Sequence, residues 1–95
     1  MSMASVDTIM RQREIMEGSL TQVLSLCDMS RGDLVVVRDL NFPDRMAWGR
    51  VVEVNPRVGY VMVSGPGGVL SVHDVKTYSF HGVVGAKERE VLTNG

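Results

Sequence analysis

The sequence predicts an α+β protein that is mainly β, with an N-terminal helix followed by five antiparallel strands that close into a small barrel. The composition changes near Arg31: five of the seven Met residues precede it, whereas 15 of the 17 Val residues and nine of the ten Gly residues follow it. Valine favours strands because its branched side chain packs well on a pleated surface, and methionine loses little freedom in a helix. The length of 95 residues leaves room for one core only.

Apolar spacing predicts a helix from residue 5 to about residue 27. The apolar residues recur mostly at intervals of three, four and seven, which is the spacing of one helical face. Ser5 is the expected N-cap, and Gly18 is the weak point because glycine costs ~1 kcal/mol relative to alanine inside a helix. We therefore expect residues 1–30 to form an amphipathic helical arm. Its apolar stripe comprises Val6, Ile9, Met10, Met16, Leu20, Val23, Leu24 and Cys27.

Short valine-rich segments separated by turn residues predict five strands within a barrel at residues 31–84. Asn, Asp, Pro and Gly supply the turns, and the connections are too short for a crossover helix, so neighbouring strands must pair antiparallel. Residues 85–95 are polar and are expected to form a tail, with a helical turn at 87–92 as the alternative. The expected strands are residues 34–38, 47–54, 58–64, 69–72 and 78–84.

Three segments of the valine-rich half share a recognisable pattern. They read Gly-Asp-Leu-Val-Val-Val at 32–37, Trp-Gly-Arg-Val-Val-Glu-Val at 48–54 and Tyr-Val-Met-Val-Ser-Gly at 60–65. This pattern resembles the Src-homology-type (SH3-like) small barrels of the KOW and Tudor-like group over about residues 32–78. The resemblance implies a five-stranded barrel, a short helical turn at 71–75 before the closing strand, and contact with RNA. The 41–48 loop departs from the Lys- and Gly-rich KOW loop, which weakens the expectation of RNA contact.

The glycines of these segments have local interpretations as well. Gly32 follows a turn and begins a strand, and Gly49 permits a bulge or a close approach of backbone beside Trp48. The run of glycines and proline at 65–68 predicts a tight reversal, because it lacks the Lys and helix start of a phosphate-binding loop. These positions therefore predict structure rather than a ligand.

The charge balance argues against a general nucleic-acid or anionic-membrane binder. Ten basic residues face eleven acidic ones, giving a net charge of −1, which removes the broad positive field that such proteins use. A local patch remains an alternative, with Arg38, Arg50 and Arg57 as candidate nucleic-acid-binding residues because arginine binds phosphate bidentately. The competing interpretation places these arginines on solvated strand faces and in turns.

Candidate catalytic groups are few. Cys27, His73, Asp74 and His81 are the only reasonable candidates, and their spacing matches no nucleophile–base or zinc motif. His73 and Asp74 point to opposite faces if they lie on a strand. A single cysteine cannot form an internal disulfide, which favours a reducing compartment. We therefore expect no enzymatic activity, no cofactor and no metal.

Docking surfaces are the stronger expectation. Phe42 and Trp48 lie close together in the predicted 41–48 loop, where an aromatic residue is either a lid on the core or an interface anchor. Residues 34–37 are all apolar, so both faces of that strand need cover, either from the helix of the same molecule or from a neighbouring subunit. The predicted protein-interface residues are Phe42, Met46, Trp48, Ile9, Met16 and Leu20.

The predicted function is a non-catalytic protein-interaction module, a small adaptor or structural subunit of a larger, phage-type or other assembly, with a protein partner or self-association. The alternative is a KOW-type nucleic-acid-binding or transcription-associated regulator. Charged residues throughout the first 17 positions argue against a signal peptide or a membrane span. We therefore expect a cytoplasmic protein, or one within a virion-like assembly, with no membrane and no small-molecule substrate.

Overall fold

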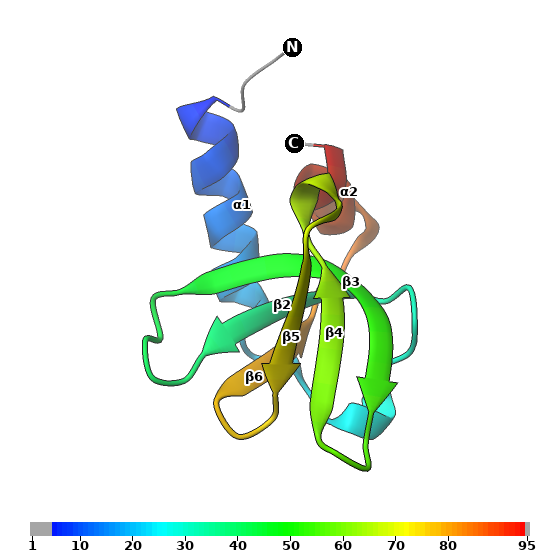
Figure 1. Ribbon diagram of the computed structural model, residues 1–95. Coiled ribbons are helices and arrows are strands. Elements are labelled where there is room, and N and C mark those ends of the chain that lie inside the picture. Colours follow the sequence, from blue (N-terminus) through cyan, green and yellow to red (C-terminus); the bar gives the residue numbers. More distant parts are fainter. Residues whose placement is uncertain (1–4, 95) are drawn as a thin grey trace.

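Two helices pack against one strongly curved antiparallel sheet in the computed structural model, which describes residues 5–94 (Figure 1). Residues 1–4 of the expected arm and residue 95 of the expected tail lie outside the described residues. The α+β, mainly β class is confirmed. The elements are α1 (Val6–Ser19), β1 (Val23–Leu24), the 3-10 turn η1 (Leu26–Asp28), β2 (Leu34–Asp39), β3 (Met46–Asn55), β4 (Tyr60–Ser64), the 3-10 turn η2 (Pro66–Gly68), β5 (Leu70–Asp74), β6 (Tyr78–Gly82) and α2 (Ala86–Asn94).

The sheet has six strands, in the order β1-β6-β2-β3-β4-β5, rather than the expected five. All five predicted strands are present, and the sixth, β1, comes from the segment that was expected to continue the helix. Val23 pairs with His81 and Leu24 pairs with Phe80, while the Gly82 N–H donates to the Gln22 carbonyl at 2.9 Å. The free edge of β6 therefore pairs with residues 23–24, a segment whose apolar spacing also suits a helix. Such tertiary pairing routinely overrides helix propensity.

Helix α1 begins as predicted and ends eight residues early. The Thr8 N–H donates to the Ser5 Oγ at 3.1 Å, which confirms Ser5 as the N-cap. At the other end Ser19 donates from its hydroxyl to the Ile15 carbonyl at 2.7 Å. The helix ends at Ser19, one residue after Gly18, the expected weak point, because glycine stabilises a helix poorly and a serine hydroxyl competes for its carbonyls.

Gly49 in β3 lies where β4 approaches most tightly. A Cβ at this position would contact the Val63 side chain and would lie 2.7 Å from the Ser64 carbonyl oxygen. Glycine thus lets β4 approach closely, which confirms the close backbone approach predicted at this position, and a register shift follows between Val51 and Glu53. The strands nevertheless form an open sheet with β1 and β5 as its edges, and not the expected closed barrel.

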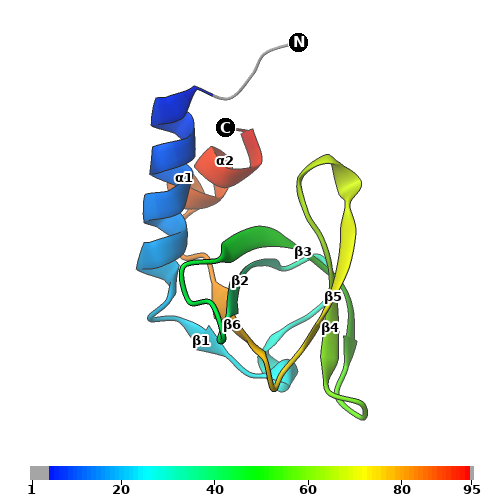
Figure 2. The same ribbon diagram turned by 60° about the vertical axis from the view of Figure 1, so that its left-hand side comes forward.

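Two apolar clusters occupy the two faces of β2. Val35 and Val37 belong to a cluster in the concavity of the sheet, and Leu34 and Val36 belong to a second cluster beneath the helices. Both helices lie on one face of the sheet, over its interior strands β6, β2 and β3 (Figures 1 and 2). Cover for the outer face of β2 therefore comes from the same molecule. The partly buried residues that pack on the second cluster are Ile15, Met16, Met46 and Trp48.

The C-terminal segment is helical, which agrees with the alternative of a helical turn at residues 87–92 rather than with a frayed polar tail. Residues 86–94 form α2, and the Leu92 side chain is only 1% exposed in the second cluster. The Gln12 side-chain amide of α1 donates to the Leu92 carbonyl at 3.3 Å. Within residues 86–94, Leu92 is the only buried residue of this short helix, so an otherwise polar composition did not reveal that the segment docks on the core.

The helical turn expected at residues 71–75 is also wrong. Leu70–Asp74 form β5, which pairs antiparallel with β4 from Ser64↔Leu70 to Tyr60↔Asp74. A turn follows at 75–77, before β6. The strand forms because the reversal at 65–68, in which Gly67 and Gly68 have positive φ values, directs residue 70 back alongside β4.

Candidate protein-interaction surface

The loop between β2 and β3 is rigidly built. Asp39 accepts hydrogen bonds at its Oδ1 from the N–H groups of Asn41 at 2.9 Å and Phe42 at 3.2 Å. The Arg45 N–H donates to the Phe42 carbonyl at 2.8 Å, and the Asp39 N–H donates to the Arg45 carbonyl at 3.1 Å. This is an aspartate-stabilised turn of the kind that fixes loop backbones locally. The conformation of the loop is therefore set without contact to another molecule.

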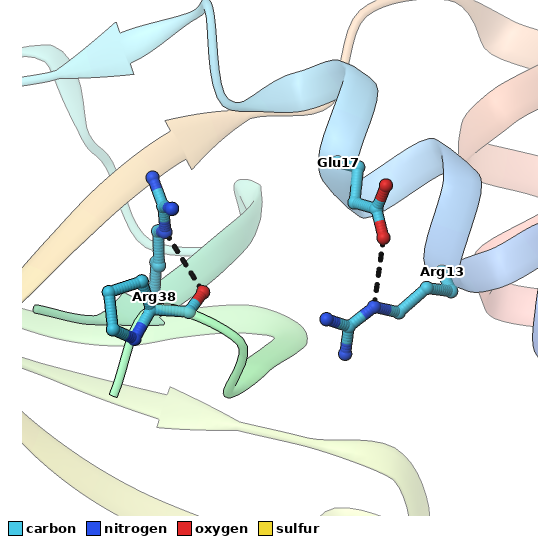
Figure 3. Close-up of polar contacts among 4 residues, drawn as sticks. Arg13, Glu17 and Arg38 are labelled. Carbon is cyan, nitrogen blue, oxygen red and sulfur yellow. Dashed lines mark hydrogen bonds and ion pairs between the residues drawn. The ribbon is translucent and has the colours of Figure 1, made fainter.

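Phe42 is presented to solvent by this loop. Its side chain is 55% exposed, and the guanidinium carbon of Arg45 lies 4.4 Å from the ring centroid. The Arg38 Nε donates to the Pro43 carbonyl at 3.0 Å and ties the loop to the end of β2 (Figure 3). An exposed aromatic ring held by a cation and a braced backbone has the properties of a preorganised anchor.

Met46 and Trp48, the other two loop candidates, have a structural role. Both are half-buried and pack against the second cluster, and Trp48 lies opposite Val36 in the β2–β3 ladder. Trp48 is thus a lid on the core, one of the two interpretations left open for it. It also lines a shallow groove of about 540 Å³ between α2 and η2, together with Leu92 and Pro66.

The three interface candidates on the N-terminal helical segment also differ in how exposed they are. Met16 packs against the second cluster and Leu20 is half-buried just beyond α1, whereas Ile9 is 55% exposed. Val6 and Met10 are exposed as well, on the turns of α1 that extend beyond the sheet (Figure 2). The six predicted interface residues therefore do not form one surface: Phe42 and Ile9 are exposed, whereas Met16, Met46 and Trp48 pack on the second cluster.

The outward face of α1 carries an ion pair near the β2–β3 loop. The Arg13 Nε lies 3.0 Å from the Glu17 Oε1 (Figure 3). In both ribbon views the loop lies beside the C-terminal end of α1 (Figures 1 and 2). Because both side chains are solvent-exposed, the pair adds at most a few tenths of a kcal/mol to stability.

The structure does not gather the three candidate nucleic-acid-binding arginines. Arg38 and Arg50 lie at opposite ends of the β2–β3 ladder, and Arg57 lies in the turn between β3 and β4. The Arg50 Nη1 donates to the Gly32 carbonyl at 3.1 Å, just as Arg38 bonds to the loop carbonyl. Two of the three guanidinium groups therefore already donate a hydrogen bond to a backbone carbonyl of this chain. This favours the competing structural interpretation of these arginines.

Two serine–histidine pairs were missed by sequence reasoning. The Ser71 Oγ lies 2.8 Å from the His73 Nε2, and the Ser79 Oγ lies 2.7 Å from the His81 Nε2. The signal was present, because residues two apart on a strand share one face. The Nδ1 atom of each histidine has no hydrogen-bond partner of good geometry among residues 5–94. Neither pair therefore has the third group that orients the histidine in a serine-nucleophile site.

The remaining chemical candidates are dispersed. His73 is half-buried, with its ring centroid 4.5 Å from that of Tyr78, whereas the neighbouring Asp74 is exposed. Cys27 is exposed in η1, where its Sγ lies 3.3 Å from the Ser25 Oγ. Within residues 5–94, no three His, Cys, Asp or Glu side chains converge in a way that could hold a metal ion.

Lowering the pH from about 7 to about 5 is expected to reduce the free energy of unfolding. Burial lowers the pKa of His73, an effect that the charge of Asp74 partly offsets, and burial lowers the pKa of His81 as well. At pH values below the ordinary histidine pKa of 6.5, the unfolded chain binds more protons than the folded chain. The free energy of unfolding therefore falls as the pH falls. Urea titrations of the wild type, His73→Gln and His81→Gln over this range measure the effect.

Both substitutions are expected to flatten this pH dependence, because glutamine does not titrate. The aspartates do not interfere in this range. Hydrogen bonds from Ser25 lower the pKa of Asp28, and hydrogen bonds from Thr77 lower the pKa of Asp74. Protonation of these two aspartates therefore changes the free energy of unfolding only below the ordinary pKa of 3.8. An unchanged slope in both variants would assign the pH dependence to other groups.

Comparison with protein-family models, with curated proteins and with solved structures gives no significant match. Neither described helix is long and apolar enough to cross a membrane. The function is therefore inferred from the geometry of the chain itself.

Proposed function

We propose that this protein is a non-catalytic interaction module that docks into a larger protein assembly through Phe42 and the β2–β3 loop. The supporting observation is a large aromatic side chain that is 55% exposed while its loop is fixed by hydrogen bonds. Binding energy at protein interfaces is concentrated in such aromatic and arginine anchors, and Arg45 stacks directly on this ring. The partner is a protein surface with an apolar pocket for the ring.

The rigidity of the loop makes this docking favourable. Association costs about 0.5–1.5 kcal/mol for each flexible side chain that becomes immobilised. Arg45 already restrains Phe42, and the contact from Arg38 to Pro43 already restrains the backbone. Little further ordering is needed when the ring enters a pocket, so most of the energy of burying it contributes to affinity.

The curvature of the sheet and the order of its strands support an SH3-like scaffold, although the sheet is open and not a closed barrel. Strands β2 to β5 follow one another through short turns, and β6 returns to lie beside β2. In scaffolds of this kind the rigid sheet positions the loops, and the loops carry the binding function. The β2–β3 loop would be the functional loop of this scaffold.

The Phe42→Ala variant is expected to lose the partner while keeping the fold. The purified wild type, Phe42→Ala and Val58→Ala would each be immobilised and exposed to a lysate of the native host, and captured proteins would be identified by mass spectrometry. Val58 is the matched control, because it is an apolar turn residue that is 72% exposed and lies in a different turn. Loss of an interface aromatic anchor typically costs about 2 kcal/mol or more, which is roughly a thirtyfold loss of affinity.

Salt and nuclease distinguish the nucleic-acid alternative. Protein docking through Phe42 should persist at high salt and after nuclease treatment, because it depends on apolar burial. Binding through Arg38, Arg50 and Arg57 would weaken steeply with salt. Capture that Phe42→Ala leaves unchanged, but that salt or nuclease removes, would overturn the docking proposal and support the KOW-type regulator. Thermal denaturation of each variant confirms that the comparison is between folded proteins.

A further inference from the structure

The outer edge of β5 carries unpaired backbone groups. The Gly65 N–H donates to the Val69 carbonyl at 2.8 Å and the Val75 N–H donates to the Gly59 carbonyl at 3.0 Å. Because hydrogen-bonding direction alternates along an antiparallel strand, odd-numbered residues of β5 bond to β4 and even-numbered residues face the opposite way. Within the described part of the chain, no strand pairs with that opposite edge. The residues whose N–H and C=O groups face it are Leu70, Val72 and Asp74.

The side chains of this edge are apolar and exposed on the outer face of the sheet. Leu70 is 60% exposed and Val72 is 57% exposed, and Val72 lies opposite Met62 of β4 in the ladder. The helices cover the other part of this face, over β6, β2 and β3. Natural edge strands are commonly protected by Lys or Pro, and residues 70–74 contain neither. The edge therefore has both the backbone groups and the apolar side chains that receive another strand.

We propose that β5 pairs antiparallel with β5 of a second copy of this chain, about a two-fold axis at Val72, so that two sheets become continuous. This axis places Val72 opposite Val72 of the second copy and places Leu70 opposite its Asp74. Every free N–H and C=O of the edge then faces a free partner, giving about six hydrogen bonds from three residue pairs. The edge is thus self-complementary, as a two-fold interface requires.

Charge also favours a second copy. Asp74 is the only formally charged residue of the strand, and the two-fold axis separates the two Asp74 side chains by four residues, or roughly 14 Å along the strand, at about 3.4 Å per residue. Like charges are therefore not brought together across the pair, where they would be destabilising. The net charge of −1 leaves little long-range repulsion between copies.

This interface is separate from the proposed docking loop. In the sheet order, β4 lies between β5 and the β2–β3 pair that carries the loop. The two proposals can therefore fail independently. Phe42→Ala should leave the dimer intact, and a variant at Val72 should leave partner capture through Phe42 intact.

The test is the molar mass in solution, measured by light scattering after size exclusion and by sedimentation equilibrium over a range of concentrations. The wild type is expected to reach twice the mass of the single chain. Val72→Lys should be monomeric because it places a charge at the centre of the pair, whereas Val58→Lys, an equivalent change at a valine 72% exposed in the β3–β4 turn, should stay dimeric.

Val72→Pro gives a second, sharper variant. It removes an N–H that faces the open edge and leaves the bonds between β4 and β5 in place, and proline is tolerated in an edge strand where its missing N–H would face solvent. We expect it to be folded and monomeric. A wild type that stays monomeric at all concentrations, a dimer that both Val72 variants retain when folded, or a larger assembly formed by head-to-tail pairing of β5 with β1 would each overturn the proposal.

Discussion

Leu92→Ala is expected to lower the free energy of unfolding by about 2–5 kcal/mol, the usual cost of removing a buried leucine side chain. Leu92 is 1% exposed and joins α2 to the second apolar cluster, in which it lies with Leu34, Val36 and Val83. The total stability of a small domain is about 5–15 kcal/mol, so the loss is large. Urea and thermal denaturation measure it, with an expected fall in the melting temperature of about 10 °C or more.

The control is Leu40→Ala, which removes the same atoms from a leucine that is 49% exposed in the β2–β3 loop. Its effect should be within about 1 kcal/mol of the wild type, because surface substitutions seldom cost more. Equal losses in the two variants would mean that α2 does not contribute to the core. The comparison therefore tests whether the last turn of the chain is part of the fold.

Gly49→Ala is expected to destabilise the protein by about 2–3 kcal/mol, although it adds only one methyl group. That methyl would lie 2.7 Å from the Ser64 carbonyl oxygen and would contact the Val63 side chain. A backbone carbonyl in a sheet cannot move aside without breaking its ladder, so β4 must shift and its packing must loosen. Denaturant unfolding measures the loss.

Gly18→Ala provides a control with the opposite sign. A Cβ at this exposed helical position meets nothing within 4 Å, and alanine stabilises a helix relative to glycine by about 0.5–1 kcal/mol. Stabilisation by Gly18→Ala and destabilisation by Gly49→Ala would show that one glycine is required by packing and the other is not. A neutral Gly49→Ala would contradict the close approach of β3 and β4.

The candidate site was only partly predictable from the sequence. The composition of the 41–48 loop indicated docking, but could not distinguish an anchor from a lid. Trp48 and Met46 turn inward to the second cluster because they belong to β3 and lie on the face that the helices cover. Phe42 stays exposed because the turn around Asp39 holds it away from that face. That difference arises from strand position and not from residue type.

The open edge of β5 was not predictable either. The spacing of residues 69–72 indicated a strand, but an edge exists only relative to neighbours, and closure into a barrel would have removed it. The serine–histidine pairs show the opposite case. Their i, i+2 spacing alone would have placed Ser71 with His73, and Ser79 with His81, once the strands were recognised.

Local sequence by itself determined the five principal strands, the turns between them and the start of α1. Valine-rich segments, turn residues such as Gly67 and Gly68, and the Ser5 cap act within a few residues, so their effect can be read without the fold. Only the tertiary structure decided that residues 23–24 leave the helix to pair with β6, and that Leu92 docks α2 onto the sheet. These outcomes depend on a free strand edge and on uncovered apolar surface, which distant parts of the chain create together.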